Sequence, residues 1–315
     1  MVSRATLWAA LMFRLLVLYS PFAMSAPSPV PVDSGVYALI GDNGEISPRN
    51  HGVVGNAGFL VGNSGVVVVD AGVSYRYGKE MFESIANVTS LPVKLVVLTH
   101  PIQEFHFGST AFQERGVPII AHRKTADLMQ QRCGNCLKNL RTTLGDDEME
   151  GSKVVVPDRL IENTTTLHEG GRELQLIYLG WASTPGDLAV FDRASGVLFA
   201  GGLISAGRIP LLRDADLDGW ISALDRLARV PAKTIVPGHG PVLTPTEAGG
   251  TLAYLRALKA KVGELYKNDV GLSESAALAR LPAFESWSLY EVVHQQNVQQ
   301  LYLQLEREDL DRKER

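Results

Sequence analysis

Residues 98–112 read LTHPIQEFHFGSTAF, and this stretch decides the fold class. The apolar run KLVVLT (94–99) is typical of a strand that is covered on both faces, and it ends directly at His100. Gly108 and an amphipathic stretch over 109–115 come next, which predict a helix. A strand, a polar loop and a helix in this order indicate a mixed α/β protein. In sheets of this kind ligands bind beyond the carboxyl ends of the strands, where this loop lies.

The same alternation of strands and helices occurs in two halves of the chain. Gly and Asn residues separate the apolar runs, which places turns between the strands. Two such halves predict an α/β protein with a four-layer αβ/βα sandwich, in which two sheets pack face to face and helices cover the outside. We expect one domain over residues 33–310. The predicted strands are 35–41, 58–63, 65–72, 94–100, 117–122, 174–180, 187–192, 196–202 and 233–240, and the predicted helices are 76–88, 109–115, 216–229, 246–268 and 287–307.

The N-terminus has the pattern of a secretion signal over residues 1–26. Arg4 and Arg14 supply positive charge, 15–24 is a short apolar run, and Ser25-Ala26 offers small residues for cleavage. The run is shorter than the roughly 20 apolar residues that span a bilayer, so a permanent anchor is the weaker interpretation. Losing the two arginines takes the formal net charge from −4 to −6. We expect a periplasmic or secreted protein with no stable membrane insertion and no nucleic-acid partner.

The chain has two cysteines, Cys133 and Cys136, in the segment RCGNC. In an oxidising compartment such a close pair predicts a local disulfide. A redox-active pair is the second interpretation, although such pairs usually follow a strand and open a helix, whereas this one lies inside a helical, polar region. A pair of soft zinc ligands is the third.

Five residues fall at the ends of predicted strands, at points that the topology would bring together. These residues are Asp70, His100, Ser183, Gly202 and His239. Because the carboxyl ends of neighbouring strands share one edge of a sheet, we expect a site there. Asp70 is expected to hydrogen-bond the His100 loop and hold its orientation.

Several segments together resemble one family, the metallo-β-lactamase-fold hydrolases. The loop THPIQEFHFGSTAF (99–112) is similar to the family motif T-H-x-H-x-D-H-x-x-G-N-A-A-F, and four other segments match in order: NAGFLVGNSGVVVVDAG (56–72), TPGDLAVFD (184–192), GVLFAGGLI (196–204) and IVPGHGPV (235–242). ISPRNHG (46–52) and NVQQLYLQLE (297–306) are similar to exported quinoprotein relay system zinc metallohydrolases, the closest subgroup. The resemblance covers residues 35–305.

The resemblance implies two zinc ions that share a hydroxide, which needs a full set of nitrogen and oxygen ligands. Position by position, His100 and His239 are kept, and Glu104 replaces an aspartate. The other four positions carry Ile102, Phe105, Ser183 and Gly202. Since neither metal would keep three protein ligands, the resemblance implies a degenerate site that has lost its dinuclear chemistry.

Two other arrangements of the candidate residues would keep a functional site. If the loop shifts by one residue, His106 joins His100, Glu104 and His239 in a vestigial or mononuclear site for one zinc ion. The spacing of Gly108 from Phe105 argues against that shift. Alternatively, Ser183 with a histidine and Glu104 has the composition of a Ser-His-acid arrangement, but no oxyanion motif surrounds it, and a turn before Pro185-Gly186 is the simpler reading.

These observations predict an exported binding or accessory protein with no metal or one zinc ion. It would bind a small-molecule ligand or assist a periplasmic oxidoreductase system, such as a quinoprotein oxidation system. The alternative is a hydrolase of an ester, thioester or lactam that uses one retained metal ion. A redox partner acting through Cys133 and Cys136 is the third hypothesis.

Overall fold

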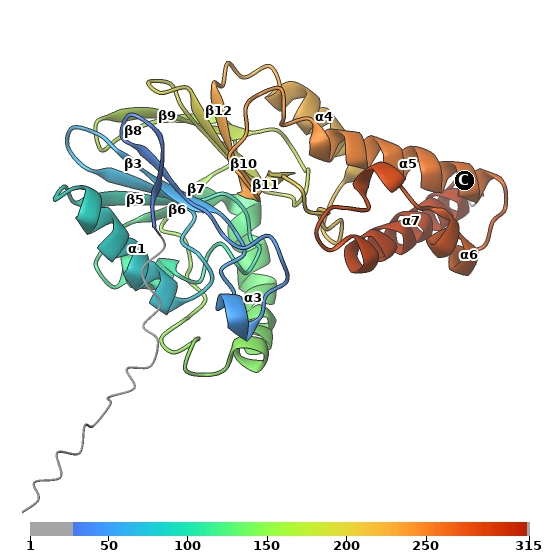
Figure 1. Ribbon diagram of the computed structural model, residues 1–315, viewed down its shortest axis with the longest axis horizontal. Helices are drawn as coiled ribbons and strands as arrows, with labels where there is room; N and C mark the ends of the chain where they lie inside the picture. The colour runs from blue at the N-terminus through green and yellow to red at the C-terminus, as the bar shows by residue number, and fades with distance from the viewer. Residues whose placement is uncertain (1–27, 314–315) are drawn as a thin grey trace, which may run out of the picture.

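The computed structural model describes residues 28–313, in which twelve strands form two sheets packed against each other (Figure 1). The first sheet runs in the order β1 (Val30–Asp33), β2 (Val36–Leu39), β3 (Ala57–Val61), β4 (Val66–Val69), β5 (Val93–Leu98), β6 (Ile119–His122) and β7 (Arg159–Ile161). The second has the order β12 (Thr234–His239), β11 (Val197–Ser205), β10 (Leu188–Asp192), β9 (Arg172–Tyr178) and β8 (Thr165–Glu169).

Helices cover the outer faces of both sheets, as the sequence predicts. The first sheet carries α1 (Tyr75–Val88), α2 (Ser109–Gln113) and α3 (Arg123–Leu144). The second carries α4 (Leu217–Leu227), α5 (Gly250–Lys267) and α7 (Gln295–Lys313), with the short helix α6 (Leu272–Leu278) beside them. The four-layer sandwich is therefore confirmed.

Strand β4 shows why continuous apolar runs mark the sheet centres. Val67 and Val69 point into the core between the two sheets, whereas Val66 and Val68 point to the layer of helices outside. Successive side chains of a strand face opposite sides, so a strand covered on both faces must be apolar throughout.

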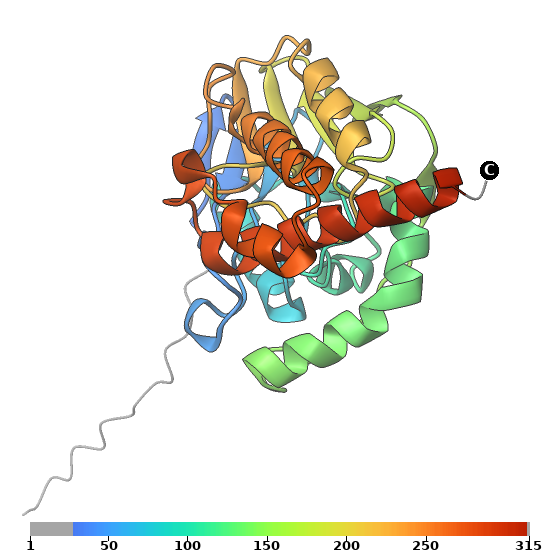
Figure 2. The same cartoon turned by 90° about the vertical axis from the view of Figure 1, so that its right-hand side faces the viewer.

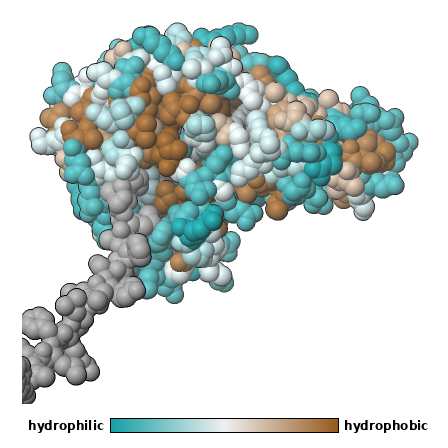
Figure 3. All heavy atoms as spheres, viewed as in Figure 1, coloured by the Kyte–Doolittle hydropathy of each residue, from teal (hydrophilic) through white to brown (hydrophobic). Residues whose placement is uncertain are grey.

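The C-terminal helices α5, α6 and α7 form an arm that projects from one side of the sandwich (Figure 1). Viewed from that side, α5 and α7 cross in front of the sheets (Figure 2). Apolar side chains gather over the sandwich in Figure 3, whereas most of the visible surface of the arm is hydrophilic.

The predicted helix 287–307 is wrong at its start. Leu289 has a left-handed backbone with φ of 66°, and a π-helix, η3 (Tyr290–His294), follows it before α7 begins at Gln295. The cause is tertiary: Ile209 N donates to Ser288 O at 3.0 Å, which holds this segment against a distant loop.

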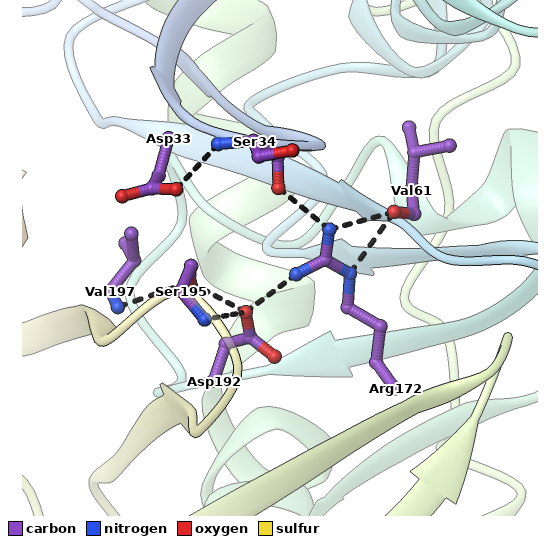
Figure 4. Close-up of polar contacts among 7 residues, drawn as sticks. All are labelled: Asp33, Ser34, Val61, Arg172, Asp192, Ser195 and Val197. Carbon is purple, nitrogen blue, oxygen red and sulfur yellow. Dashed lines mark hydrogen bonds and ion pairs between the residues drawn. The ribbon is translucent and has the colours of Figure 1, made fainter.

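Arg172 joins the two sheets at the strand ends opposite the site, and Figure 4 shows its contacts. Its guanidinium donates to the backbone oxygens of Val61 and Ser34, and pairs with Asp192 at 2.6 Å. Ser195 completes this cluster by donating to the same Asp192 oxygen. The side chains of Arg172 and Asp192 are almost fully buried, and we call this ion pair the clamp between the sheets. Removing either partner would leave the other as a buried charge without a counter-ion.

In the part of the chain that the structure describes, no helix is both long enough and apolar enough to cross a membrane. The expected signal peptide, residues 1–26, lies outside the described residues.

Candidate functional site

The strand ends converge on one cavity of about 140 Å³, as expected from the topology. His100 follows β5, Ser183 follows β9, Gly202 lies in β11, and His239 ends β12. These residues line the cavity together with Ile102 and Glu104.

A series of hydrogen bonds from Asp70 through Thr99 fixes the position of His100. Asp70 accepts from Thr99 N at 2.8 Å and from Thr99 Oγ1 at 2.7 Å, and Thr99 Oγ1 lies 2.7 Å from His100 Nδ1. Burial raises the pKa of Asp70 to about 7. When Asp70 is ionised, Thr99 gives its only hydroxyl proton to it, so Nδ1 carries the proton in the contact with Thr99 and His100 Nε2 is left as an acceptor. Burial lowers the pKa of His100 to about 3, so the ring is neutral.

Glu104 and His239 pair with each other inside the cavity. Glu104 Oε1 lies 3.2 Å from His239 Nε2. Burial alone would raise the pKa of Glu104, but the hydrogen bond from His239 and the positive charge of Arg208 outweigh it and lower this pKa to about 2. Burial lowers the pKa of His239. The pair therefore holds an ionised carboxylate beside an imidazole that donates to it.

Phe105 packs against both histidines of the cavity. Its ring centroid lies 4.2 Å from that of His100 and 5.2 Å from that of His239, and its side chain is almost completely buried. An aromatic carbon surface therefore contacts two imidazoles, and it has no lone pair to offer a cation.

His106 does not join the other candidate ligands. It is buried on the opposite side of the loop, where Nε2 lies 3.3 Å from Cys133 Sγ and Nδ1 has no hydrogen-bond partner among residues 28–313. Burial lowers its pKa to about 4. The structure thus brings together His100, Glu104 and His239, but not the set with His106 that a shifted loop would give.

Ser183 is committed to a turn. Its hydroxyl donates to Asp187 Oδ1 at 2.9 Å, and Thr184 N and Oγ1 donate to the same carboxylate. Burial raises the pKa of Asp187 to about 6. Because the Ser183 proton goes to Asp187 and not to a histidine, the Ser-His-acid arrangement is not formed.

Gly202 leaves room for the residues around it. A Cβ at this position would lie 2.8 Å from His100 Cδ2 and 2.8 Å from Ser183 Oγ. Any side chain here, including a metal-ligating one, would require these neighbours to move.

The residues at this site do not fit a two-zinc centre. Across residues 28–313, no group of three or more His, Cys, Asp or Glu side chains is arranged to hold a metal ion. Ile102, Phe105 and Gly202 offer no donor, and the carboxylate of Glu104 is already paired with His239.

Cys133 and Cys136 are free thiols on α3, three residues apart. The expected local disulfide is not formed in the structure. Cys133 packs into the core behind the His100 loop, and Cys136 is half-buried.

Much of the cavity wall was not predicted from the sequence. Arg208, Arg213 and Asp214 add charge, and Ile209, Pro210, Leu211, Leu289 and Val293 add an apolar side. Arg208 donates to the backbone oxygens of Asn43 and Gly44. No motif marks these residues, because they come from loops and from the π-helix that only the folded chain brings to the site.

Comparisons with known proteins agree with this architecture. The family model described as the metallo-beta-lactamase superfamily matches residues 52–239, and the chain belongs to this superfamily. A protein named metallo-beta-lactamase type 2 from Bacillus sp. (strain 170) is 25% identical over 205 residues, which are 64% of this chain and 70% of that relative.

Solved structures support the same assignment. A metallo-beta-lactamase from Pontibacter korlensis superposes with a TM-score of 0.59 at 26% identity, over 73% of this chain and 98% of its own. The structure of TMB-1 has a TM-score of 0.58 over 73% of this chain and 96% of its own, and at 18% identity it supports the fold alone. The matched family region ends at residue 239. The arm therefore lies beyond it, as do Leu289 and Val293, which line the cavity.

Proposed function

We propose that this chain is an exported metallo-β-lactamase-fold protein that has lost the dinuclear zinc centre and binds a small molecule without hydrolysing it. The observation that carries the proposal is the position of Phe105, at a family ligand position and packed against both His100 and His239. Ile102 and Gly202 line the same cavity and offer no donor. Two bridged cations without enough anionic ligands would repel each other.

The cavity retains the features of a binding site. Its volume of about 140 Å³ is close to the roughly 150 Å³ that holds a benzene-sized ligand in an engineered apolar cavity. Ile102, Ile209 and Leu289 give it an apolar wall, while Glu104 and Arg208 supply polar groups that would fix a ligand's orientation. The site therefore suits a compact compound of ring size.

The cellular role is proposed from the resemblance to exported quinoprotein relay system proteins. On that ground the chain would act as an accessory of a periplasmic oxidoreductase system and bind one of its small-molecule ligands. Secretion of the mature protein, with residues 1–26 removed, is part of the same proposal.

The alternative function is a hydrolase of an ester, thioester or lactam with one retained metal ion. What favours it is that His100, Glu104 and His239 line the same cavity. They would be its ligands, and a bound ion would supply Lewis-acid activation. This alternative requires the Glu104–His239 pair to open.

Metal analysis of the full chain, purified without chelator from the periplasm, separates the two functions. Under our proposal the protein carries less than about 0.2 zinc ion per chain. About one ion, lost in both His100→Ala and His239→Ala, would establish the alternative, and about two ions would overturn the proposal. His51→Ala serves as a control, because His51 pairs with Glu148 away from the cavity.

Ligand binding is tested through Trp220, which lines the cavity. We expect ring-sized compounds with a polar group to change its fluorescence. Val293→Trp, which fills the cavity from the arm, should lower the affinity at least about tenfold. Binding that is unchanged in this variant would place the ligand elsewhere.

A further inference from the structure

The two cysteines are neighbours on one face of α3. Residues three apart on a helix have Cβ atoms about 5–6 Å apart. Both thiols are free, and they differ in exposure: Cys133 is 1% exposed, whereas Cys136 is half-buried. One thiol is therefore accessible to a reagent, and the other lies beside it in the core.

The surroundings of the two thiols differ as well. Cys133 Sγ lies 3.3 Å from His106 Nε2 and 3.8 Å from the backbone oxygen of Pro101. A hydrogen bond from Cys133 lowers the pKa of Cys136, and the positive charge of Arg213 acts in the same direction. The same hydrogen bond, together with burial, raises the pKa of Cys133. A more exposed and more acidic thiol is the one that attacks first in disulfide exchange.

We propose that Cys133 and Cys136 form a reversible dithiol–disulfide site that exchanges with a small-molecule or protein disulfide. The Cys136 thiolate attacks one sulfur of the substrate disulfide, and the other sulfur leaves as a thiolate. Cys133 then attacks Cys136 Sγ, gives its proton to a leaving thiolate and releases the second substrate thiol. The cysteine pair is oxidised by two electrons, and the substrate disulfide is reduced to two thiols.

The geometry of α3 makes a Cys133–Cys136 disulfide easy to reduce, unlike a structural disulfide. A disulfide needs Cβ atoms about 3.5–4.5 Å apart, which is less than their separation on a regular helix. Oxidation must therefore tighten α3 locally around Gly134, where no atom of residues 28–313 outside the local helix backbone lies within 4 Å of an added Cβ. Strain of this kind makes a disulfide easier to reduce.

The site is separate from the cavity function. The exchange requires no metal and no ligand in the cavity, so metal content and redox behaviour are independent measurements. A failure of one proposal leaves the other intact.

The test uses the full chain in glutathione buffers of graded disulfide-to-thiol ratio, followed by alkylation and peptide mass analysis. We expect an internal Cys133–Cys136 disulfide in excess glutathione disulfide and complete reduction in excess glutathione. Cys133→Ala should trap glutathione on Cys136, and Cys136→Ala should react at least about tenfold more slowly. No internal disulfide, or one that excess glutathione does not reduce, would overturn the proposal.

Gly134→Ala is a second test that keeps both thiols, so its result does not depend on whether a cysteine variant folds. Alanine favours a regular helix over glycine by about 1 kcal/mol, so it should shift the equilibrium toward the dithiol by about fivefold. An unchanged equilibrium would mean that oxidation leaves the helix regular, which contradicts the proposed source of reversibility.

Discussion

Glu104 and His239 form a hydrogen-bonded pair: Glu104 Oε1, in the loop after β5, lies 3.2 Å from His239 Nε2, at the end of β12. The two residues are 135 positions apart in sequence. Each is a retained or conservatively altered ligand position by resemblance to the family, and in this protein they form a buried pair.

We expect Glu104→Gln to lower the free energy of unfolding by about 1.5–3 kcal/mol near neutral pH, because it removes a charge-assisted hydrogen bond. The folded pKa is about 2 against an ordinary 4.5, so this stabilisation is complete above pH 4.5 and is lost as the pH falls towards 2. Urea unfolding of both proteins measures it. Glu162→Gln, at an exposed ion pair, is the control, and equal stability of Glu104→Gln and the wild type would contradict the paired geometry.

His106 predicts a specific dependence of stability on pH. Its folded pKa of about 4 lies below the ordinary 6.5, so the folded protein binds fewer protons than the unfolded chain between these values. As the pH falls from 6.5 to about 4, the wild type should lose up to about 3 kcal/mol of stability that His106→Gln does not lose. Unfolding at several pH values measures this difference, and parallel curves would show that His106 is not buried in its neutral form.

Gly202→Ala tests the tight packing around the cavity. The added methyl group would meet His100 and Ser183 at 2.8 Å, and we expect a loss of about 1–3 kcal/mol of stability. Gly263→Ala is a matched control on α5, since nothing lies within 4 Å of its Cβ position and alanine favours the helix. Thermal unfolding should rank the control above the wild type and Gly202→Ala below it. The opposite order would contradict the packing.

Arg172→Ala breaks the clamp between the sheets. We expect a loss of about 3–5 kcal/mol, because Asp192 would remain as an uncompensated buried charge. Arg193→Ala is the control: Arg193 pairs with Glu173 close by, but both side chains are exposed, so the loss should stay below about 1 kcal/mol. Urea unfolding compares the two variants. Zinc content and ligand binding should not change, since the clamp lies at the strand ends opposite the cavity.

The fold class could be predicted from the sequence because the pattern is local. Runs such as 66–69 and 95–98 are apolar throughout, which requires cover on both faces of a sheet, and the second run also places His100 just past the end of its strand. The helix over 287–307 was wrong at its start because hydrogen bonds to a distant loop hold Leu289 in a left-handed conformation. Local periodicity carries no information about such contacts.

By itself, the sequence determined which residue types stand at the strand ends, and hence that Ile102, Phe105 and Gly202 offer no metal donor. The tertiary structure alone decided how the remaining side chains are used. His106 faces Cys133 and not the cavity, Glu104 pairs with His239, and the arm closes one wall of the site. The physical reason is that donor chemistry belongs to a residue wherever it lies, whereas partners and burial are set only when segments distant in the sequence pack together.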